Sequence, residues 1–513
     1  ARCMAEIFKL ESTILANLAI QHMRFAHLCL LFIVALLSAN DRPNVLLLCV
    51  DDLRPDLKSF GADYIHSPNI DRLAESGLAF HQHYTNAPTC GASRYTMLTG
   101  RYGPDNNQSL FKRAEQMRNS DSKTPPSMPE WFRKHGYVTV SVGKVSHHPG
   151  GWGGVDWDDK DILEMPGAWT RQLMPIGAWQ HPRGAMHSLA HGEVRSGRST
   201  GKNKMDAFQS SPGPDTIYHD GLIADEGEAQ LEQLASGDQP FFLAIGLIKP
   251  HLPFGAPKAY MEPYEGVELP PIPHPQKPEQ PSTWHHSGEF FGQYNHYGKD
   301  PRKDSKYADE VRRHYAACVS YADKQIGDIL AKLKECGRDK DTIVVLWGDH
   351  GWHLGEHAIW GKHSLFEESL RSPLIISAPA MENHGQKTDA VVETSDIFST
   401  LCELANVPTP YFVDGRSLRP QLQNPDTPGH GAIAYRRDGS TIRTETHRLI
   451  IHKNGDVELY DHNSPEKETR NIAGSNPELV MNLARRIHER SPEKLSETLL
   501  EKLAANLKPN ALQ

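Results

Sequence analysis

The sequence predicts an α/β fold with a large, mainly parallel central sheet flanked by helices, followed by a small antiparallel sheet. Of the 513 residues, 38% are hydrophobic and 23% are charged, so there is enough apolar material for a large core. Apolar runs typical of buried strands alternate with helical stretches that end at glycine, which indicates a parallel sheet covered by helices. Towards the C-terminus, period-two runs separated by Asp-Gly and Asn-Gly turns indicate the antiparallel sheet.

The first 40 residues are expected to be a leader that precedes the fold. Within residues 23–40, Arg24 is followed by an apolar run over 28–37 and by two small residues, the layout of a secretory signal peptide. The run is short for a membrane span, which needs about 20 apolar residues. A retained anchor is the alternative. We expect an exported protein, periplasmic or extracellular, without stable membrane insertion.

Five continuous apolar runs are expected to form strands that are buried on both faces of the central sheet. They cover residues 44–50, 137–143, 240–247, 342–348 and 373–379. Because parallel strands end at a common edge, functional side chains should gather where these runs end.

Helices are expected between these strands, at residues 69–77, 127–136, 223–236 and 311–337. Two segments, 150–215 and 253–306, are rich in Gly, Pro and His without a clear period, and are expected to be irregular binding loops. The expected organisation is a large α/β domain over residues 41–425 and a C-terminal α+β subdomain over residues 426–513.

Acidic residues follow two of the expected strands. Asp51 and Asp52 come directly after the first strand, and Asp349 and His350 follow strand 342–348. For either pair taken alone, a turn or a helix cap is the favoured explanation. Together, two parallel strands would deliver three carboxylates to one edge, where they repel one another unless a cation neutralises them. Mostly oxygen ligands favour a hard divalent ion, Ca²⁺ or Mg²⁺.

Basic residues follow the other expected strands. They are Lys144, His147 and His148 after strand 137–143, Lys249 and His251 after strand 240–247, and His353, His357, Lys362 and His363 after Asp349. Any one of them alone is explained by a solvated or packed side chain. Together they predict a site for phosphate or sulfate. The formal net charge of −9 and the pI of about 6.3 argue against nucleic-acid binding, so this basic site has to be local.

Cys90 stands apart from the other six cysteines. Cys3 and Cys29 lie in the leader, and the others occupy apolar contexts without metal-ligand spacing. Cys90 precedes "SRYTMLTG", which predicts a short helix with Ser93 in its first turn and Gly100 as its stop. A helix N-terminus favours anions, so Cys90 is either an activated nucleophile or an inert buried thiol.

The stretch "CGASRYTMLTGR" resembles the signature of type I sulfatases, in which Cys-x-Pro-x-Arg is followed by Thr-Gly-Arg. Other segments resemble that family in the same order, and "VDDLRP", "GKVSHH", "KPHLPF" and "DHGWHLGEH" are most similar to its iduronate-2-sulfatase-like branch. The resemblance implies the alkaline phosphatase superfamily fold, the hydrolysis of sulfate esters, and a catalytic role for the domain over residues 41–425.

The resemblance also implies that a dedicated enzyme oxidises Cys90 to Cα-formylglycine. In the family, one hydroxyl of the hydrated aldehyde attacks the sulfur, and the other allows the sulfated intermediate to release sulfate. The implied metal ligands are Asp51, Asp52, Asp349, His350 and an oxygen of residue 90, and the family leans to Ca²⁺ over Mg²⁺.

The remaining implied roles belong to five cations. Arg94 would hold the hydrate and the metal carboxylates, Lys144 and Lys362 would bind sulfate oxygens, His251 would bind the substrate and protonate its leaving oxygen, and His147 would orient the hydrate. Two positions depart from the family pattern: Ala92 replaces proline, and Ser146 replaces an aromatic residue before two histidines. The spacing from Lys144 favours His147 over His148.

The expected substrate is a sulfated polysaccharide or its oligosaccharides, with a 2-sulfated uronic acid suggested by analogy alone. Loop cations that could bind an acidic sugar are His181, Arg183, His187, His191, Arg436 and Arg437. Two alternatives remain. One is a phosphodiesterase or phosphonate monoester hydrolase on the same fold. The other is a non-catalytic sulfated-polysaccharide-binding protein with unconverted Cys90.

Overall fold

The computed structural model describes residues 42–119, 121–148, 163–179, 185–193, 204–278, 288–379 and 381–506. The predicted leader lies outside these residues. Across the described ranges, no helix combines the length and the apolar composition that crossing a membrane requires.

The central sheet has eight strands in the order β13-β2-β12-β9-β1-β7-β4-β5. Their bounds are β1 Asn44–Val50, β2 Leu78–Phe80, β4 Val138–Gly143, β5 Arg171–Leu173, β7 Phe241–Leu247, β9 Thr342–Gly348, β12 Leu374–Ser377 and β13 Gln386–Thr388. All neighbouring strands are parallel except β12, which is antiparallel to both β9 and β2. The predicted α/β class is therefore confirmed.

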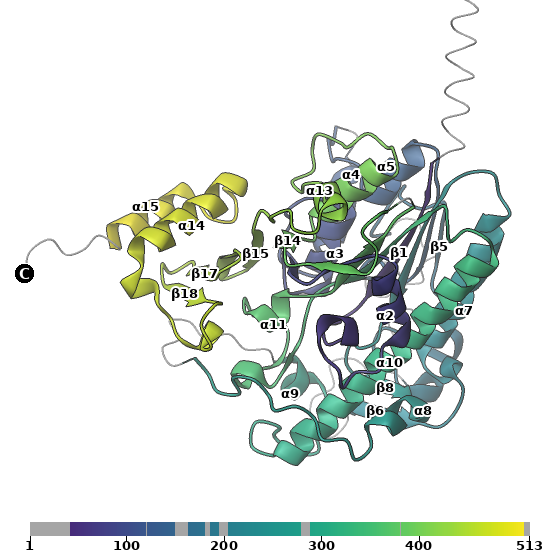
Figure 1. Cartoon of the computed structure of the whole chain (residues 1–513), viewed down its shortest axis with the longest axis horizontal. Coiled ribbons are helices and arrows are strands. Elements are labelled where there is room, and N and C mark those ends of the chain that lie inside the picture. The colour runs from purple at the N-terminus through teal and green to yellow at the C-terminus, as the bar shows by residue number, and fades with distance from the viewer. Residues whose placement is uncertain are drawn as a thin grey trace, which may run out of the picture.

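Helices cover both faces of this sheet (Figure 1). Alternate residues of β1 point to opposite faces, so that Leu46 and Leu48 pack in one core and Val45 and Leu47 in the other. The first core includes α2 (Pro68–Glu75), α7 (His219–Ala235) and α10 (Ser305–Glu335). The second includes α3 (Cys90–Thr99), α4 (Ser109–Met117), α5 (Met128–Lys134) and α12 (Asp396–Leu404).

The segments that the sequence predicts as irregular contain short elements. These are β6 (Phe208–Ser211), β8 (Phe254–Pro257), α8 (Lys258–Met261) and α9 (Glu289–Gln293), with 3-10 turns η3 (Gly177–Trp179), η4 (Ala190–Gly192), η5 (Asp215–Ile217) and η6 (Glu262–Tyr264). Further short elements are η1 (Lys58–Phe60), β3 (His83–Tyr84), β10 (His353–Leu354), η7 (Glu356–Ala358), β11 (Trp360–Gly361), α11 (Glu367–Leu370), β14 (Val392–Glu393) and α13 (Arg419–Gln423). Most have five residues or fewer, too short to show a period in the sequence.

A separate four-stranded antiparallel sheet follows, beside the central sheet and coloured towards yellow in Figure 1. It consists of β15 (Ala432–Arg436), β16 (Gly439–Arg443), β17 (His447–His452) and β18 (Val457–Asp461), followed by η8 (Lys467–Thr469), η9 (Ala473–Ser475), α14 (Pro477–Arg490) and α15 (Glu497–Asn506). The predicted meander is confirmed, and two helices, α14 and α15, follow it. Their apolar faces pack on the sheet in a core of their own.

Buried ion pairs connect this sheet to the rest of the chain. Arg448 on β17 lies 2.6 Å from Glu367 and 2.5 Å from Glu468, and the Arg448 and Glu468 side chains are each only 1% exposed. The side chain of Arg490 on α14 lies 2.8 Å from the buried carboxylate of Glu393. The C-terminal sheet is therefore fixed by charge as well as by apolar packing.

Candidate active site

The predicted site residues lie at the carboxyl ends of four neighbouring strands, β9, β1, β7 and β4. The first three strands pair in register, so that Val50 of β1 lies opposite both Gly348 of β9 and Leu247 of β7. Asp51 and Asp349 continue this alignment, because Asp51 N–H donates to the Leu247 carbonyl and Asp349 N–H to the Val50 carbonyl, at 3.3 and 3.1 Å. The order of the strands thus brings distant acidic residues together.

Cys90 reaches the same place from the start of helix α3. The helix begins at Cys90 itself, one turn earlier than the sequence predicts, and the Gly91 N–H donates to the side-chain oxygen of Asn107 at 2.9 Å. The predicted stop is confirmed, since Gly100 adopts the left-handed conformation at φ 66°. Cys90 is 2% exposed and belongs to the acidic cluster rather than to either apolar core.

The predicted metal ligands form one buried cluster. One ligand atom from each of Asp51, Cys90, Asp349 and His350 lies within 4.8 Å of the others, and the same holds for Asp51, Asp52, Cys90 and His251. The structure thus brings the five expected ligand residues close together, and His251 lies among them.

Two features of this cluster fit a hard divalent cation. Oδ2 of Asp52 is buried without a hydrogen-bonding partner in the described part of the chain. His350 places Nδ1 3.0 Å from the Gly351 carbonyl, which accepts a hydrogen bond from Nδ1–H and so leaves the lone pair on Nε2. That Nε2 lies 3.2 Å from Sγ of Cys90 and 3.4 Å from Asp52. Three carboxylates and one oriented imidazole are ligands that such an ion accepts.

The pKa values of the three aspartates reflect their burial and their mutual repulsion. Burial and the neighbouring Asp51 raise the pKa of Asp349 to about 7. Burial, incompletely offset by Lys362, likewise raises the pKa of Asp52 well above its usual range. For Asp51, burial is outweighed by Lys144, His251 and Arg94, which hold its pKa well below normal. The cluster thus carries more acidic groups than its cations can keep ionised at neutral pH.

Arg94 ties the acidic residues together from helix α3. The guanidinium is fully buried and lies 3.2 Å from Asp51 and 3.0 Å from Asp349. It also donates to the carbonyl oxygens of Lys144 and Val145, at 3.1 Å for Val145. One arginine therefore fixes the ends of β1, β9 and β4 relative to one another.

Lys144 and Lys362 approach the cluster from two different parts of the chain, the end of β4 and the end of β11. The ammonium group of Lys362 lies 2.7 Å from Asp52 and 3.2 Å from Sγ of Cys90. Lys144 pairs with Asp51. Gly246 allows this close approach of β4 and β7, because a Cβ there would lie 2.1 Å from the backbone of Lys144. Each lysine is at most 3% exposed.

Glu289 on α9 is a charged residue of the site that the sequence did not reveal. Its carboxylate lies 3.7 Å from His251 and 3.8 Å from Lys362, and its Oε2 is buried without a hydrogen-bonding partner among the described residues. It belongs to the segment 253–306, where nothing in the sequence separates one acidic residue from another. The only available signal was the length of that irregular segment.

The adjacent residues His147 and His148 have different surroundings, and the Lys249 side chain is directed away from the acidic cluster. His148 lies 3.1 Å from Glu164, whereas Nδ1 of His147 is buried without a partner in the described chain. Lys249 donates to the carbonyls of Ser188, His251 and Pro253, so it holds a loop rather than facing the cluster.

The predicted loop cations are only partly described. His181 and Arg183 lie outside the described residues. The His187 ring lies 5.4 Å from the His251 ring.

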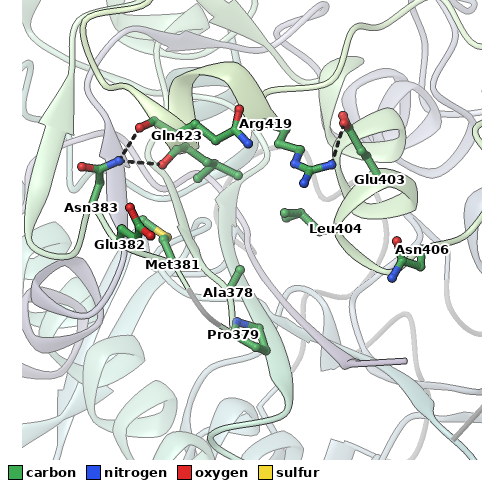
Figure 2. Close-up of a pocket in the computed structure, with 11 residues that line it drawn as sticks. Ala378, Pro379, Met381, Glu382, Asn383, Glu403, Leu404, Asn406, Arg419 and Gln423 are labelled. Atoms are coloured by element: carbon green, nitrogen blue, oxygen red, sulfur yellow. Dashed lines mark hydrogen bonds and ion pairs between the residues drawn. The ribbon is translucent and has the colours of Figure 1, made fainter. Parts of the chain in front are cut away.

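A separate pocket of about 410 Å³ lies between β12, α12 and α13 and contains none of the predicted site residues. Figure 2 shows the residues that line it, with Arg419 paired to Glu403.

Solved structures share this fold over most of the chain. A protein in complex with its substrate D-glucosamine-2-N,6-O-disulfate has a TM-score of 0.67 at 20% identity, covering 89% of this chain and 100% of that one. The phosphonate monoester hydrolase of Agrobacterium radiobacter has a TM-score of 0.68 at 21% identity, covering 88% and 96%. These likenesses define the fold class, an α/β fold with a large, mainly parallel central sheet.

The sequence comparisons define the family within this class. Residues 43–407 match the family model described as Sulfatase, and residues 355–494 match that described as N-sulphoglucosamine sulphohydrolase, C-terminal. Iduronate 2-sulfatase of Mus musculus is 30% identical over 407 residues, which are 73% of this chain and 70% of that protein. The chain belongs to the sulfatase family and is a sulfuric ester hydrolase.

Proposed function

We propose that this sulfatase hydrolyses sulfate esters on carbohydrates, using a formylglycine made from Cys90 and a divalent metal ion. The observation that carries the proposal is the meeting of Cys90 with three buried carboxylates and the Lys362 ammonium group. An unmodified buried thiol is a poor occupant of such a place, because burial and Asp51 raise its pKa well above normal and keep it protonated.

Asp51, Asp52, Asp349 and His350 would hold the ion, for which Ca²⁺ is our first choice and Mg²⁺ the second. When bound, such an ion polarises a sulfate oxygen and favours ionisation of a hydroxyl nucleophile. The formylglycine hydrate would supply that hydroxyl. Arg94, already bonded to Asp51 and Asp349, keeps the carboxylates in place.

Lys144 and Lys362 would bind the sulfate oxygens and offset charge that develops during transfer. Both ammonium groups point into the acidic cluster, where Lys362 also contacts Sγ of Cys90. His251 would protonate the leaving sugar oxygen, and its inclusion among the clustered ligand atoms supports this role. We assign the orientation of the hydrate to His147, because His148 is held by Glu164.

We propose a sulfated poly- or oligosaccharide as the substrate, because the similar solved protein is bound to a disulfated glucosamine and a similar relative is an iduronate 2-sulfatase. Export through residues 23–40 would place the enzyme where such polymers occur. A cleaved N-terminus in the secreted protein, found by peptide mass, is the test of export.

Mass spectrometry of the peptide that contains Cys90 tests the proposal directly. Conversion to formylglycine lowers its mass by about 18 Da, the difference between CH₂SH and CHO. Detection of the unconverted thiol alone, with no formylglycine peptide, would contradict the proposed nucleophile and favour a binding protein. The converted enzyme should release sulfate from defined sulfated oligosaccharides faster than it cleaves phosphate diesters or phosphonate monoesters. The reverse order would favour the phosphonate hydrolase alternative.

A further inference from the structure

A second group of metal-ligand side chains lies after the proposed calcium ligands in the chain. His353 is on β10, His357 on η7 and Glu368 on α11, and one ligand atom from each lies within 4.8 Å of the other two. Nδ1 of His353 lies 3.9 Å from Oε2 of Glu368, and Nδ1 of His357 lies 3.6 Å from the same oxygen. None of these residues has a role in the proposed reaction.

Three polar atoms of this group are buried without a hydrogen-bonding partner among the described residues. Neither ring nitrogen of His357 has a hydrogen-bonding partner in the described chain, and this residue is 1% exposed. Oε2 of Glu368 is also buried without a partner among the described residues. Buried polar groups are nearly always satisfied, so several unpaired atoms that face one another indicate a ligand between them.

Within the described part of the chain, no lysine or arginine forms an ion pair with Glu368, and the nearby Arg54 pairs with another carboxylate. Arg54 pairs with Glu356 at 2.9 Å, and Arg448 pairs with Glu468 at 2.5 Å. Burial, Glu356 and Glu468 raise the pKa of Glu368 well above its usual range. A metal cation would supply the charge that this carboxylate lacks.

Other contacts hold the two imidazoles in place. Nε2 of His353 lies 2.8 Å from the Ser364 hydroxyl, which leaves Nδ1 towards Glu368. That Nδ1 also lies 3.2 Å from the Glu356 carbonyl, which accepts a hydrogen bond when Nδ1 carries the proton. Metal binding requires the proton on Nε2 instead, where the Ser364 hydroxyl, which itself donates to Ser369, accepts it. His357 has a left-handed backbone at φ 54°, its N–H donates to the His274 carbonyl at 2.7 Å, and its ring stacks on Phe366. Such supporting contacts are typical of metal-binding histidines.

We propose that His353, His357 and Glu368 bind a divalent transition-metal ion of the Zn²⁺ type, in a structural site separate from the acidic cluster. Two imidazoles and one carboxylate are a ligand set that zinc accepts, whereas the acidic cluster suits a harder ion. The distances of 3.6 and 3.9 Å join pairs of ligand atoms. Bonds of about 2.0–2.2 Å from these atoms to a shared zinc ion would require them to move only slightly closer together. A surface pocket of about 200 Å³ is lined in part by Glu368 and Arg54.

The site would fix the segment between His350 and Lys362. This segment carries one proposed calcium ligand and one proposed sulfate-binding lysine, and His353 and His357 lie within it. Binding through Glu368 on α11 would connect it to the element that lies beyond Lys362. The predicted role is therefore structural.

Equilibrium dialysis of the full chain against Zn²⁺, with excess Ca²⁺ to saturate the acidic cluster, tests the proposal. One Zn²⁺ ion per chain is expected, and Co²⁺ in its place should give the visible absorption of a four- or five-coordinate nitrogen and oxygen site. No bound Zn²⁺, or Co²⁺ with the spectrum of the hydrated ion, would overturn the proposal and leave water as the occupant. This measurement needs no variant.

Variants then assign the ion to its ligands. His357→Gln and Glu368→Gln should each lower Zn²⁺ affinity by more than about 100-fold, above the 10–100-fold effect of supporting residues. His314→Gln, which changes a buried histidine stacked on Phe208, should leave the affinity unchanged. Loss of Zn²⁺ in Asp349→Asn but not in His357→Gln would place the ion in the acidic cluster and contradict the proposal.

Discussion

The backbone N–H of Asp52 donates a hydrogen bond of 2.9 Å to Oδ1 of Asp349. Asp52 makes this bond in the left-handed conformation, at φ 59°, which is uncommon for a residue with a side chain. Its carbonyl oxygen meanwhile accepts from the Tyr315 hydroxyl at 2.8 Å. The two acidic strand ends are thus joined through the backbone, with strain held at the site itself.

Asp349→Asn should abolish metal retention and turnover together. The amide keeps an oxygen for the Asp52 N–H but removes the charge that a cation requires, so the fold should persist while the site fails. Calorimetric titration with Ca²⁺ and a sulfate-release assay measure the two effects. Asp328→Asn, which removes a surface partner of Lys324, is the matched control and should change neither. Normal turnover in metal-free Asp349→Asn would refute the assignment.

Metal affinity should increase with pH below about 7. The pKa of Asp349 is raised to about 7, so below that pH the carboxyl carries a proton that the ion has to displace. Affinity should therefore rise about tenfold per pH unit for each displaced proton. Titrations between pH 5.5 and 8 in buffers of different ionisation enthalpy count the protons. A flat profile over this range would contradict the prediction.

His251→Gln should slow the hydrolysis of sugar sulfates by about 10²–10⁴-fold, the usual contribution of a general acid. The effect should be much smaller for 4-nitrophenyl sulfate, whose leaving group needs no proton. Burial, Lys362 and Lys144 hold the pKa of His251 well below 6.5. Because only the protonated ring donates, kcat/KM for sugar sulfates should fall as pH rises through that low pKa. An equal loss for both substrates would exclude the proposed role.

Glu289→Gln should move the same alkaline limb to lower pH. The carboxylate lies 3.7 Å from His251, where its charge favours the protonated ring. Removing one charge at this distance should shift the limb by about one pH unit or more. Glu289→Asp should restore part of the shift. The exposed Glu268→Gln is the control, and an unmoved limb would assign Glu289 a purely structural role.

Arg448→Met should destabilise the C-terminal sheet by about 3–5 kcal/mol, because it leaves the buried carboxylate of Glu468 without this partner. It also removes one of the two arginines that pair with Glu367. Adding Glu468→Gln to Arg448→Met should recover part of the loss. Denaturant unfolding followed by fluorescence compares the variants. A double variant less stable than Arg448→Met alone would show that the ion pair is not the cause.

The sequence indicated the strands and the acidic and basic side chains at their ends because buried parallel strands leave a strong apolar signal, as in 44–50 and 342–348. It did not indicate the antiparallel direction of β12, since an apolar run has no orientation. Nor could it reveal Glu289 or the pairing of His148 with Glu164, which depend on how irregular segments fold over the sheet. The helix at Cys90 began one turn early because Asn107, distant in sequence, supports its first turn.

The position of β9 in the middle of the sheet also imposes an order on biosynthesis. Cys90, Asp51 and Asp52 leave the ribosome long before Thr342–Gly348, the strand that brings Asp349 against them. Until that strand docks, Asp349 and the residues after it do not cover the thiol. In the folded protein only 2% of Cys90 is exposed. The proposed conversion of Cys90 therefore requires an enzyme that acts on the nascent or unfolded polypeptide, before β9 inserts beside β1.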